Sequence, residues 1–184
     1  MRTVRLIYLD HGDLSELSPR ELRAAADDKL LSLAFGQEYG KIEKNEFGKP
    51  FLSEKDGRHF SISHAKGCSV IGVSDTELGV DIEEISEMSG RRLKINDDIA
   101  GQYFAEEYKK QYVMAKEERK TEVFTLCWTA TEAMLKAAGT GFHADPRNNP
   151  EVYEGWKVKS FLHRGYAVSI AMREEFEIVK DRNE

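Results

Sequence analysis

The sequence predicts an α+β fold, and a weak internal repeat indicates two similar lobes, each a small antiparallel sheet with packed helices. Apolar residues alternate in the opening segment and form short runs in the middle and last thirds of the chain, as expected for strands. Between these segments they recur at helical spacing. The sequences HAKG at residues 64–67 and HRG at residues 163–165 each precede an apolar strand, which indicates either a duplication or a chance likeness of two hairpins.

The first elements have clear local signals. Alternation over residues 4–9 predicts an opening strand. Ser18 is a good N-cap residue, Pro19 suits the first helical position and Glu21 completes a capping box. These residues predict a helix that ends just before Gly40.

The later elements follow the same two periods. Three apolar runs predict an antiparallel meander, two segments with helical spacing predict helices, and two further runs predict strands. In chain order they are residues 59–63, 69–74, 78–82, 95–120, 129–138, 156–162 and 166–172. We place an N-terminal lobe at residues 1–84 and a C-terminal lobe at residues 85–184.

The amino-acid composition and charge exclude some classes of function and location. The chain has 184 residues, 40% of them hydrophobic, which suffices for one core or for two small lobes that share one. A net charge of -6 without a long basic block argues against nonspecific nucleic-acid binding. Arg2 and Arg5 interrupt the opening segment, so it predicts neither a signal peptide nor a membrane span. Because Cys68 and Cys127 form no CxxC pattern, we expect buried thiols and a cytoplasmic location.

The sequence LGVDIE at residues 78–83 carries the strongest local signal for chemistry. On a strand, Asp81 and Glu83 project from one face while Val80 and Ile82 turn into the core. Two adjacent carboxylates repel each other unless a cation or a proton lies between them. The motif therefore indicates either a site for a hard cation such as Mg²⁺ or a solvated strand edge.

A second motif, WTATEAMLK, occupies residues 128–136. Glu132 and Lys136 are four residues apart and share one face of a helix. One side chain could bind a metal while the other binds a phosphate group of the same ligand. Thr129 and Glu132 also fit a capping box, so an ordinary surface pair is the alternative.

A third motif, FSISHAK at residues 60–66, offers phosphate donors at the end of a strand. Ser63 and His64 are the candidates. A hydrolase site is disfavoured, because adjacent residues cannot easily form a nucleophile–base pair and the chain has no G-x-S-x-G elbow.

Taken in order, GKPF at residues 48–51, FSISH at 60–64, GVDIE at 79–83 and the helix motif at 128–136 resemble the 4′-phosphopantetheinyl transferase superfamily. The likeness is to the monomeric type that activates surfactin synthetase and other nonribosomal peptide synthetases. It implies a pseudo-twofold α+β protein that binds coenzyme A in the cleft between its lobes.

The resemblance also implies roles for single residues. Asp81, Glu83 and Glu132 would hold Mg²⁺ or Mn²⁺, and Lys136 would contact a phosphate of the ligand. Ser63 and His64 would contact the nucleotide phosphates, with His64 at the 3′-phosphate. Lys49 would lie near the adenine end.

The activity so implied moves the phosphopantetheine arm of coenzyme A to a serine of an apo-acyl or peptidyl carrier protein and releases 3′,5′-ADP. Glu132 or a metal-bound water would accept the serine proton. The family usually has a lysine at the place of Thr131, and we expect its absence to weaken phosphate binding. On the N-terminal helix, Lys29 is the base nearest to the family position for the 3′-phosphate.

Three alternatives stay open from the sequence. The first is a degenerate homologue that binds coenzyme A or a carrier protein without turnover. The second is an unrelated Mg²⁺-dependent phosphohydrolase, and the third is a small interaction domain.

Overall fold

The computed structural model describes residues 1–53, 57–85, 90–143 and 145–181. One strand and one helix open the chain, and a run of five strands, a run of three helices and a final run of three strands follow, with short 3₁₀ turns between several of these elements. In order they are β1 (Arg2–Asp10), η1 (Gly12–Glu16), α1 (Pro19–Phe35), β2 (Ile42–Lys44), β3 (Pro50–Leu52), β4 (His59–Ala65), β5 (Cys68–Ser74), β6 (Leu78–Glu84), α2 (Gly90–Tyr103), α3 (Glu106–Met114), η2 (Glu117–Arg119), α4 (Lys120–Ala138), η3 (Gly141–His143), η4 (Pro150–Tyr153), β7 (Lys157–His163), β8 (Tyr166–Met172) and β9 (Phe176–Lys180).

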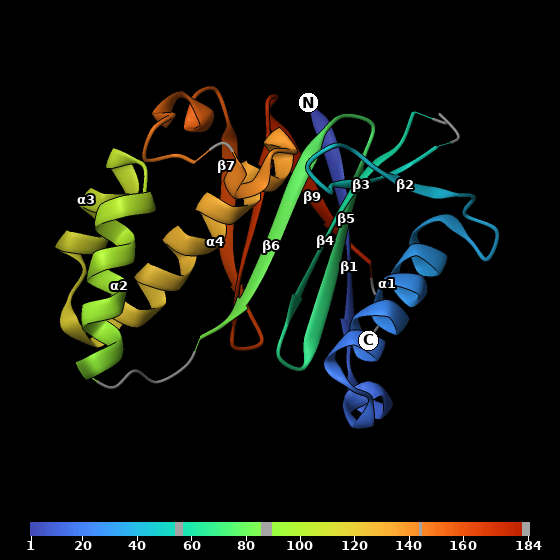
Figure 1. Cartoon of the computed structure of the whole chain (residues 1–184), viewed down its shortest axis with the longest axis horizontal. Helices are drawn as coiled ribbons and strands as arrows, with labels where there is room; N and C mark the ends of the chain where they lie inside the picture. Colours follow the sequence, from blue (N-terminus) through green and yellow to red (C-terminus); the bar gives the residue numbers. More distant parts are fainter. Residues whose placement is uncertain (54–56, 86–89, 144, 182–184) are drawn as a thin grey trace.

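Two sheets form the centre of the molecule, and helices cover their outer faces (Figure 1). One sheet has the order β4-β5-β1-β9, the other has the order β6-β8-β7, and β2 pairs with β3 in a short ribbon. Helix α1 lies against the first sheet, and α2, α3 and α4 lie on the side of the second. The predicted α+β class is confirmed, whereas the duplication stays a prediction.

Strand β1 shows how alternation builds these layers. Val4 and Leu6 belong to the apolar cluster between the two sheets, whereas Ile7 and Leu9 belong to the cluster under α1. Because successive side chains of a strand point to opposite faces, one strand contributes to two cores. The two sheets therefore pack face to face with a helical layer outside each.

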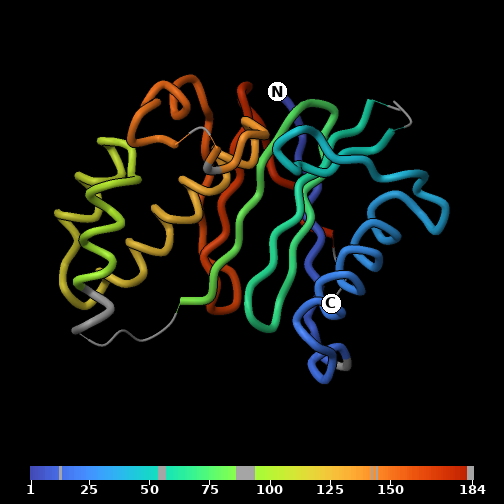
Figure 2. The backbone as a smooth tube through the Cα atoms, in the orientation of Figure 1, coloured from blue at the N-terminus to red at the C-terminus, as the bar shows by residue number. Residues whose placement is uncertain are grey.

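The edges of the two sheets adjoin at β4 and β6 (Figure 2). The backbone N–H of Val80 on β6 donates to the Ser61 Oγ on β4 at 3.0 Å. Ser63 Oγ of β4 donates to Asp81 Oδ1 of β6 at 2.7 Å. Side chains thus join the two edges here, and the candidate site lies at this junction.

The predicted three-stranded meander is wrong in its third strand. Strand β6 pairs antiparallel with β8, with Val80 opposite Ile170, so it leaves the sheet of β4 and β5. Strand β9 in turn pairs parallel with β1, with Val4 opposite Ile178. Both sheets therefore include strands from each side of the boundary that we placed after residue 84, and the division into lobes stays a prediction.

Helix boundaries also differ from those expected. Helix α1 ends at Phe35, where Gly36 adopts φ +95°, a conformation that favours glycine. The segment predicted as one helix over residues 95–120 contains two helices separated at Ala105, whose backbone is extended. Helix α4 begins at Lys120 rather than near residue 129.

None of the helices within the described residues combines the length and the apolar character needed to cross a membrane.

Candidate functional site

Gly79 lets β6 and α4 approach each other with no side chain between them. A Cβ atom at this position would lie 2.0 Å from the carbonyl oxygen of Ala133 and 2.4 Å from the backbone nitrogen of Ala137. Both distances are far below any real contact. The glycine of the GVDIE motif is therefore a packing requirement, and it brings the carboxylates of β6 beside Glu132 of α4.

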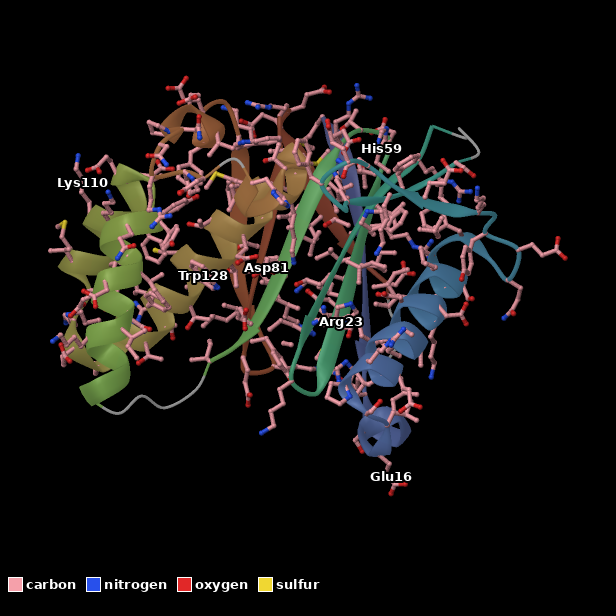
Figure 3. The ribbon with its side chains drawn as sticks, in the orientation of Figure 1. Glu16, Arg23, His59, Asp81, Lys110 and Trp128 are labelled. Carbon is pink, nitrogen blue, oxygen red and sulfur yellow. The ribbon has the colours of Figure 1, made fainter. Side chains whose placement is uncertain are left out.

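A cavity of about 620 Å³ lies at this junction, between α1, the β2–β3 ribbon, β4, β6 and α4. Figure 3 shows Asp81 near the centre of the molecule, between Arg23 of α1 on one side and Trp128 of α4 on the other. The cavity wall includes six side chains that the sequence singled out. They are Ser63, His64, Asp81, Glu83, Glu132 and Lys136.

Asp81 is 3% exposed, and its two carboxylate oxygens differ sharply. Oδ1 accepts hydrogen bonds from the Ser63 hydroxyl and from the Lys136 ammonium group, each at 2.7 Å. Oδ2 is buried and has no hydrogen-bond partner among the residues that the structure describes. A buried charged oxygen without a partner is costly, so this atom calls for a cation or a donor that a ligand brings.

The predicted orientation of the motif is confirmed, since Val80 and Ile82 are fully buried in the core between the sheets.

Glu83 and Glu132 have strongly perturbed carboxyl groups. Burial, followed by the negative charge of Asp81, raises the pKa of each to about 7, while Lys136 acts in the opposite direction. Each additional ionised carboxylate in this wall repels the others. Once ionised, Asp81, Glu83 and Glu132 together therefore carry more negative charge than Lys136 balances.

The residue types fit a hard divalent cation, because three carboxylates from two elements line one cavity and Asp81 Oδ2 finds no partner in the described ranges. The three carboxylates are, however, too far apart in this structure to coordinate one ion together. Among the described residues, no three His, Cys, Asp or Glu side chains already lie close enough to hold a metal ion. Lys136 neutralises Asp81 instead, so a bound cation requires this ammonium group to move or to share the carboxylate.

Ser63 and His64 have distinct positions. Ser63 joins Asp81 and Lys136, because its hydroxyl donates to Asp81 Oδ1 and accepts from Lys136 Nζ, both at 2.7 Å. The imidazole of His64 lies 3.0 Å from Asp27 Oδ1 through Nε2 and 2.8 Å from Ser69 Oγ through Nδ1.

Lys49 is placed differently from the other candidates. It lines a smaller pocket of about 230 Å³ that shares Pro50 and Lys136 with the main cavity. Its ammonium group pairs with Glu77 and reaches the carbonyl oxygen of Ala137 at 3.3 Å. Together with a 3.4 Å contact to the Leu78 carbonyl oxygen, these contacts tie the turn between β2 and β3 to β6 and to α4. A role for Lys49 at the adenine end stays a prediction.

Thr131 lies outside the cavity wall. It is fully buried, and its hydroxyl donates to the carbonyl oxygen of Cys127 at 2.9 Å. The residue before Glu132 therefore faces the protein interior, because one step along a helix turns the side chain by about 100°. Thr131 itself does not line the cavity, and the effect of a lysine at this position on phosphate binding stays a prediction.

Sequence reasoning missed part of the wall contributed by α1. Arg23 and Asp27 line the cavity, whereas Lys29, the base that we considered, is exposed and does not line it. A signal existed in the spacing, because residues 23 and 27 are four apart and share one face of the helix. Lys44 from β2 adds a further base to the wall.

Comparison with known proteins decides the family. The sequence model of the 4′-phosphopantetheinyl transferase superfamily matches residues 77–174, more than half of the chain. The chain belongs to this superfamily. The matched range contains Asp81, Glu83, Glu132 and Lys136, whereas Lys49, Ser63 and His64 lie before it.

Several curated transferases are similar to the chain over part of their length. It is 39% identical to the 4′-phosphopantetheinyl transferase gsp of Aneurinibacillus migulanus, over 55% of this chain and 39% of that protein. A 4′-phosphopantetheinyl transferase of Bacillus subtilis is 26% identical over 65% and 53%, respectively. The transferase Sfp of Bacillus subtilis strain 168 is 24% identical over 55% and 42%. These matches span about two fifths to one half of the relatives.

Proposed function

We propose that this phosphopantetheinyl transferase homologue moves the 4′-phosphopantetheine group of coenzyme A to a serine of an apo-acyl or peptidyl carrier protein. The arrangement of β6 against α4 supports this most directly. It places three carboxylates and Lys136 on one cavity wall, within the range that the superfamily matches. The named relatives support the same activity.

We assign Asp81, Glu83 and Glu132 to a divalent cation, Mg²⁺ or Mn²⁺. The partnerless Oδ2 of Asp81 and the raised pKa values of both glutamates support the assignment, because a cation relieves both costs. When bound, the cation supplies a Lewis acid that stabilises charge on the pyrophosphate.

Four side chains are proposed to hold the ligand. Lys136 moves away from Asp81 and contacts a phosphate group of the ligand. Ser63 contacts the same part of the ligand, because its hydroxyl is hydrogen-bonded to Lys136. His64 meets the 3′-phosphate, and Lys49 lies toward the adenine from the adjoining pocket.

The chemistry is a single phosphoryl transfer. The serine Oγ of the carrier forms a bond to the β-phosphorus, the bond from that phosphorus to the leaving oxygen breaks, and 3′,5′-ADP departs. Glu132 is the proposed acceptor of the serine proton.

The deciding experiment measures intact masses of several apo-carrier proteins after incubation with coenzyme A, Mg²⁺ and this protein. We expect one phosphopantetheine group to be added, and Asp81→Asn or excess EDTA to abolish the addition nearly completely. Glu84→Gln is the matched control, since Glu84 lies exposed on the same strand.

Full transfer in EDTA, or by Asp81→Asn, would rule out the metal assignment. Tight coenzyme A binding without transfer to any carrier would instead support the degenerate homologue.

A further inference from the structure

Four side chains form a hydrogen-bonded series behind one wall of the cavity. His11 Nε2 lies 2.7 Å from Ser69 Oγ, and Ser69 Oγ lies 2.8 Å from His64 Nδ1. His64 Nε2 lies 3.0 Å from Asp27 Oδ1. The four residues come from the segment after β1, from β5, from β4 and from α1, so only the folded chain brings them together.

The series is buried at one end and open at the other. Ser69 is 0% exposed and His11 is 5% exposed, and neither lines the cavity. His64 and Asp27 do line it. Ser69 and His11 therefore cannot touch a ligand in the cavity. Ser69 contacts the imidazole of His64, which can, and His11 acts on that imidazole only through Ser69.

The Asp27 carboxylate, at the end of the series that lines the cavity, determines the direction of the hydrogen bonds. An ionised carboxylate only accepts, so His64 Nε2 carries a proton. In a neutral ring Nδ1 is then an acceptor, and the Ser69 hydroxyl donates to it. The Ser69 oxygen in turn accepts from the Nε2–H of His11, which leaves each of these donors with an acceptor.

The surroundings of His11 agree with this direction. Burial, followed by the proximity of His64, lowers the pKa of the His11 imidazole, while Asp10 acts in the opposite direction. A neutral His11 with its proton on Nε2 fits the serine oxygen without placing a buried charge.

We propose that Ser69 and His11 are positioning residues that fix the ring and the proton of His64, so that its Nε2–H faces the cavity. There a phosphate group of the ligand takes the place of the Asp27 carboxylate. The inference rests on the proposed function and deepens it, because it explains how a histidine becomes a preorganised donor for an anion. A donor already held in place costs no reorientation on binding.

The test compares the dissociation constants of coenzyme A and 3′-dephospho-coenzyme A by calorimetry. His64→Ala should reduce the preference for the 3′-phosphate roughly tenfold or more, the effect of one hydrogen bond to a charged group. Ser69→Ala should reduce it by roughly three- to tenfold, and should have no further effect in the His64→Ala background.

Matched variants separate positioning from general damage. Ser74→Ala removes another buried hydroxyl of β5, which donates to the Thr3 carbonyl oxygen, and should leave the preference unchanged. His11→Gln keeps an amide donor near the place of Nε2 and should retain the preference, whereas His11→Phe should lose part of it.

An equal loss of affinity for both ligands in Ser69→Ala, or an additive loss in the double variant, would overturn the proposal.

Nitrogen-15 NMR of the ligand-free protein tests the same geometry without any ligand. We expect an unprotonated His64 Nδ1 whose resonance moves downfield in Ser69→Ala. A protonated Nδ1 in the wild-type protein would reverse the series and overturn the inference. Failure to bind coenzyme A would count against the proposed function, and in that case the NMR result alone decides the positioning.

Discussion

At the scale of single residues, the site is an arrangement of charges that do not balance in the ligand-free protein. Within the described part of the chain, one oxygen of Asp81 accepts from two donors and the other from none. Glu83 and Glu132 resist ionisation because they are buried beside that aspartate. Repulsion between buried carboxylates is typical of a functional site whose charge a bound ligand neutralises. It also lowers the free energy of unfolding by an amount that can be measured.

We predict that Glu83→Gln stabilises the metal-free protein more at pH 8 than at pH 5. The pKa of Glu83 is raised from 4.5 to about 7 in the folded state, so the stability that its protonated form contributes is present below 4.5 and lost as pH rises through 7. After allowance for solvent screening, the gain at pH 8 is about 1–2 kcal/mol. Thermal unfolding in EDTA at both pH values measures it.

Glu84→Gln is the control for this comparison. It should leave the Tm unchanged at both pH 5 and pH 8, because Glu84 is exposed. An equal shift of Tm at pH 5 and pH 8 in Glu83→Gln would show that the effect does not come from ionisation.

Thr131→Lys is predicted to destabilise the protein rather than to improve coenzyme A binding. The lysine would have to enter a fully buried position, at a cost of about 2–4 kcal/mol. Urea unfolding measures this, with the nearly isosteric Thr131→Val as the control. A well-folded Thr131→Lys protein with a lower KM for coenzyme A would restore the expectation drawn from the sequence.

At the scale of elements, the contact between β6 and α4 decides whether the site exists. The two elements meet at Gly79, where no side chain fits against the α4 backbone. Asp81 and Glu83 follow on the same face of the strand, while Glu132 precedes and Lys136 follows the contacted residue Ala133 on the helix. The spacing of the two motifs is thus set by one close approach.

We therefore predict that Gly79→Ala costs roughly 3 kcal/mol or more of stability, since the added carbon would collide with backbone that cannot move aside cheaply. Any folded remainder should also lose transfer activity, because α4 is displaced from Asp81. Gly101→Ala is the matched control. Its added carbon meets nothing within 4 Å in helix α2, so we expect a gain of about 0.5–1 kcal/mol.

Chemical denaturation of both variants checks the pair. Equal small effects would mean that β6 and α4 can separate without loss, and that the glycine has no packing role.

At the scale of the whole molecule, strands from distant parts of the chain close both sheets. Strand β9 adds to β1 in parallel, and β6 adds to β8. Phe176 at the start of β9 is buried in the cluster between the sheets. The last described strand therefore supports the same core that holds β6, although no proposed site residue lies within it.

We predict that Phe176→Ala destabilises the protein by about 3–5 kcal/mol, the usual cost of removing a buried aromatic ring. Val179→Ala on the same strand should cost less than about 1 kcal/mol, because Val179 is 49% exposed. Urea unfolding followed by circular dichroism measures both. A Phe176→Ala protein as stable as the control would show that β9 is not part of the core.

Local features of this protein could be read from its sequence. The capping box of Ser18 and Glu21 forms as predicted, and both predicted hairpins appear, with His64 opposite Ser69 and His163 opposite Tyr166. The face of β6 that carries Asp81 was also predicted correctly. Each of these features depends on neighbouring residues alone, and their periods and turn preferences are written in a short stretch of chain.

Only the tertiary structure decided the rest. It assigned β6 to the sheet of β8, placed Arg23 and Asp27 in the cavity wall, and turned Thr131 away from it. The alternation of a strand says which side chains share a face but not which strand lies beside it, and a helical stripe says nothing of what covers it. Strand pairing and the composition of the cavity wall depend on contacts between residues far apart in the chain. The shapes and charges of those residues must be complementary in the folded protein.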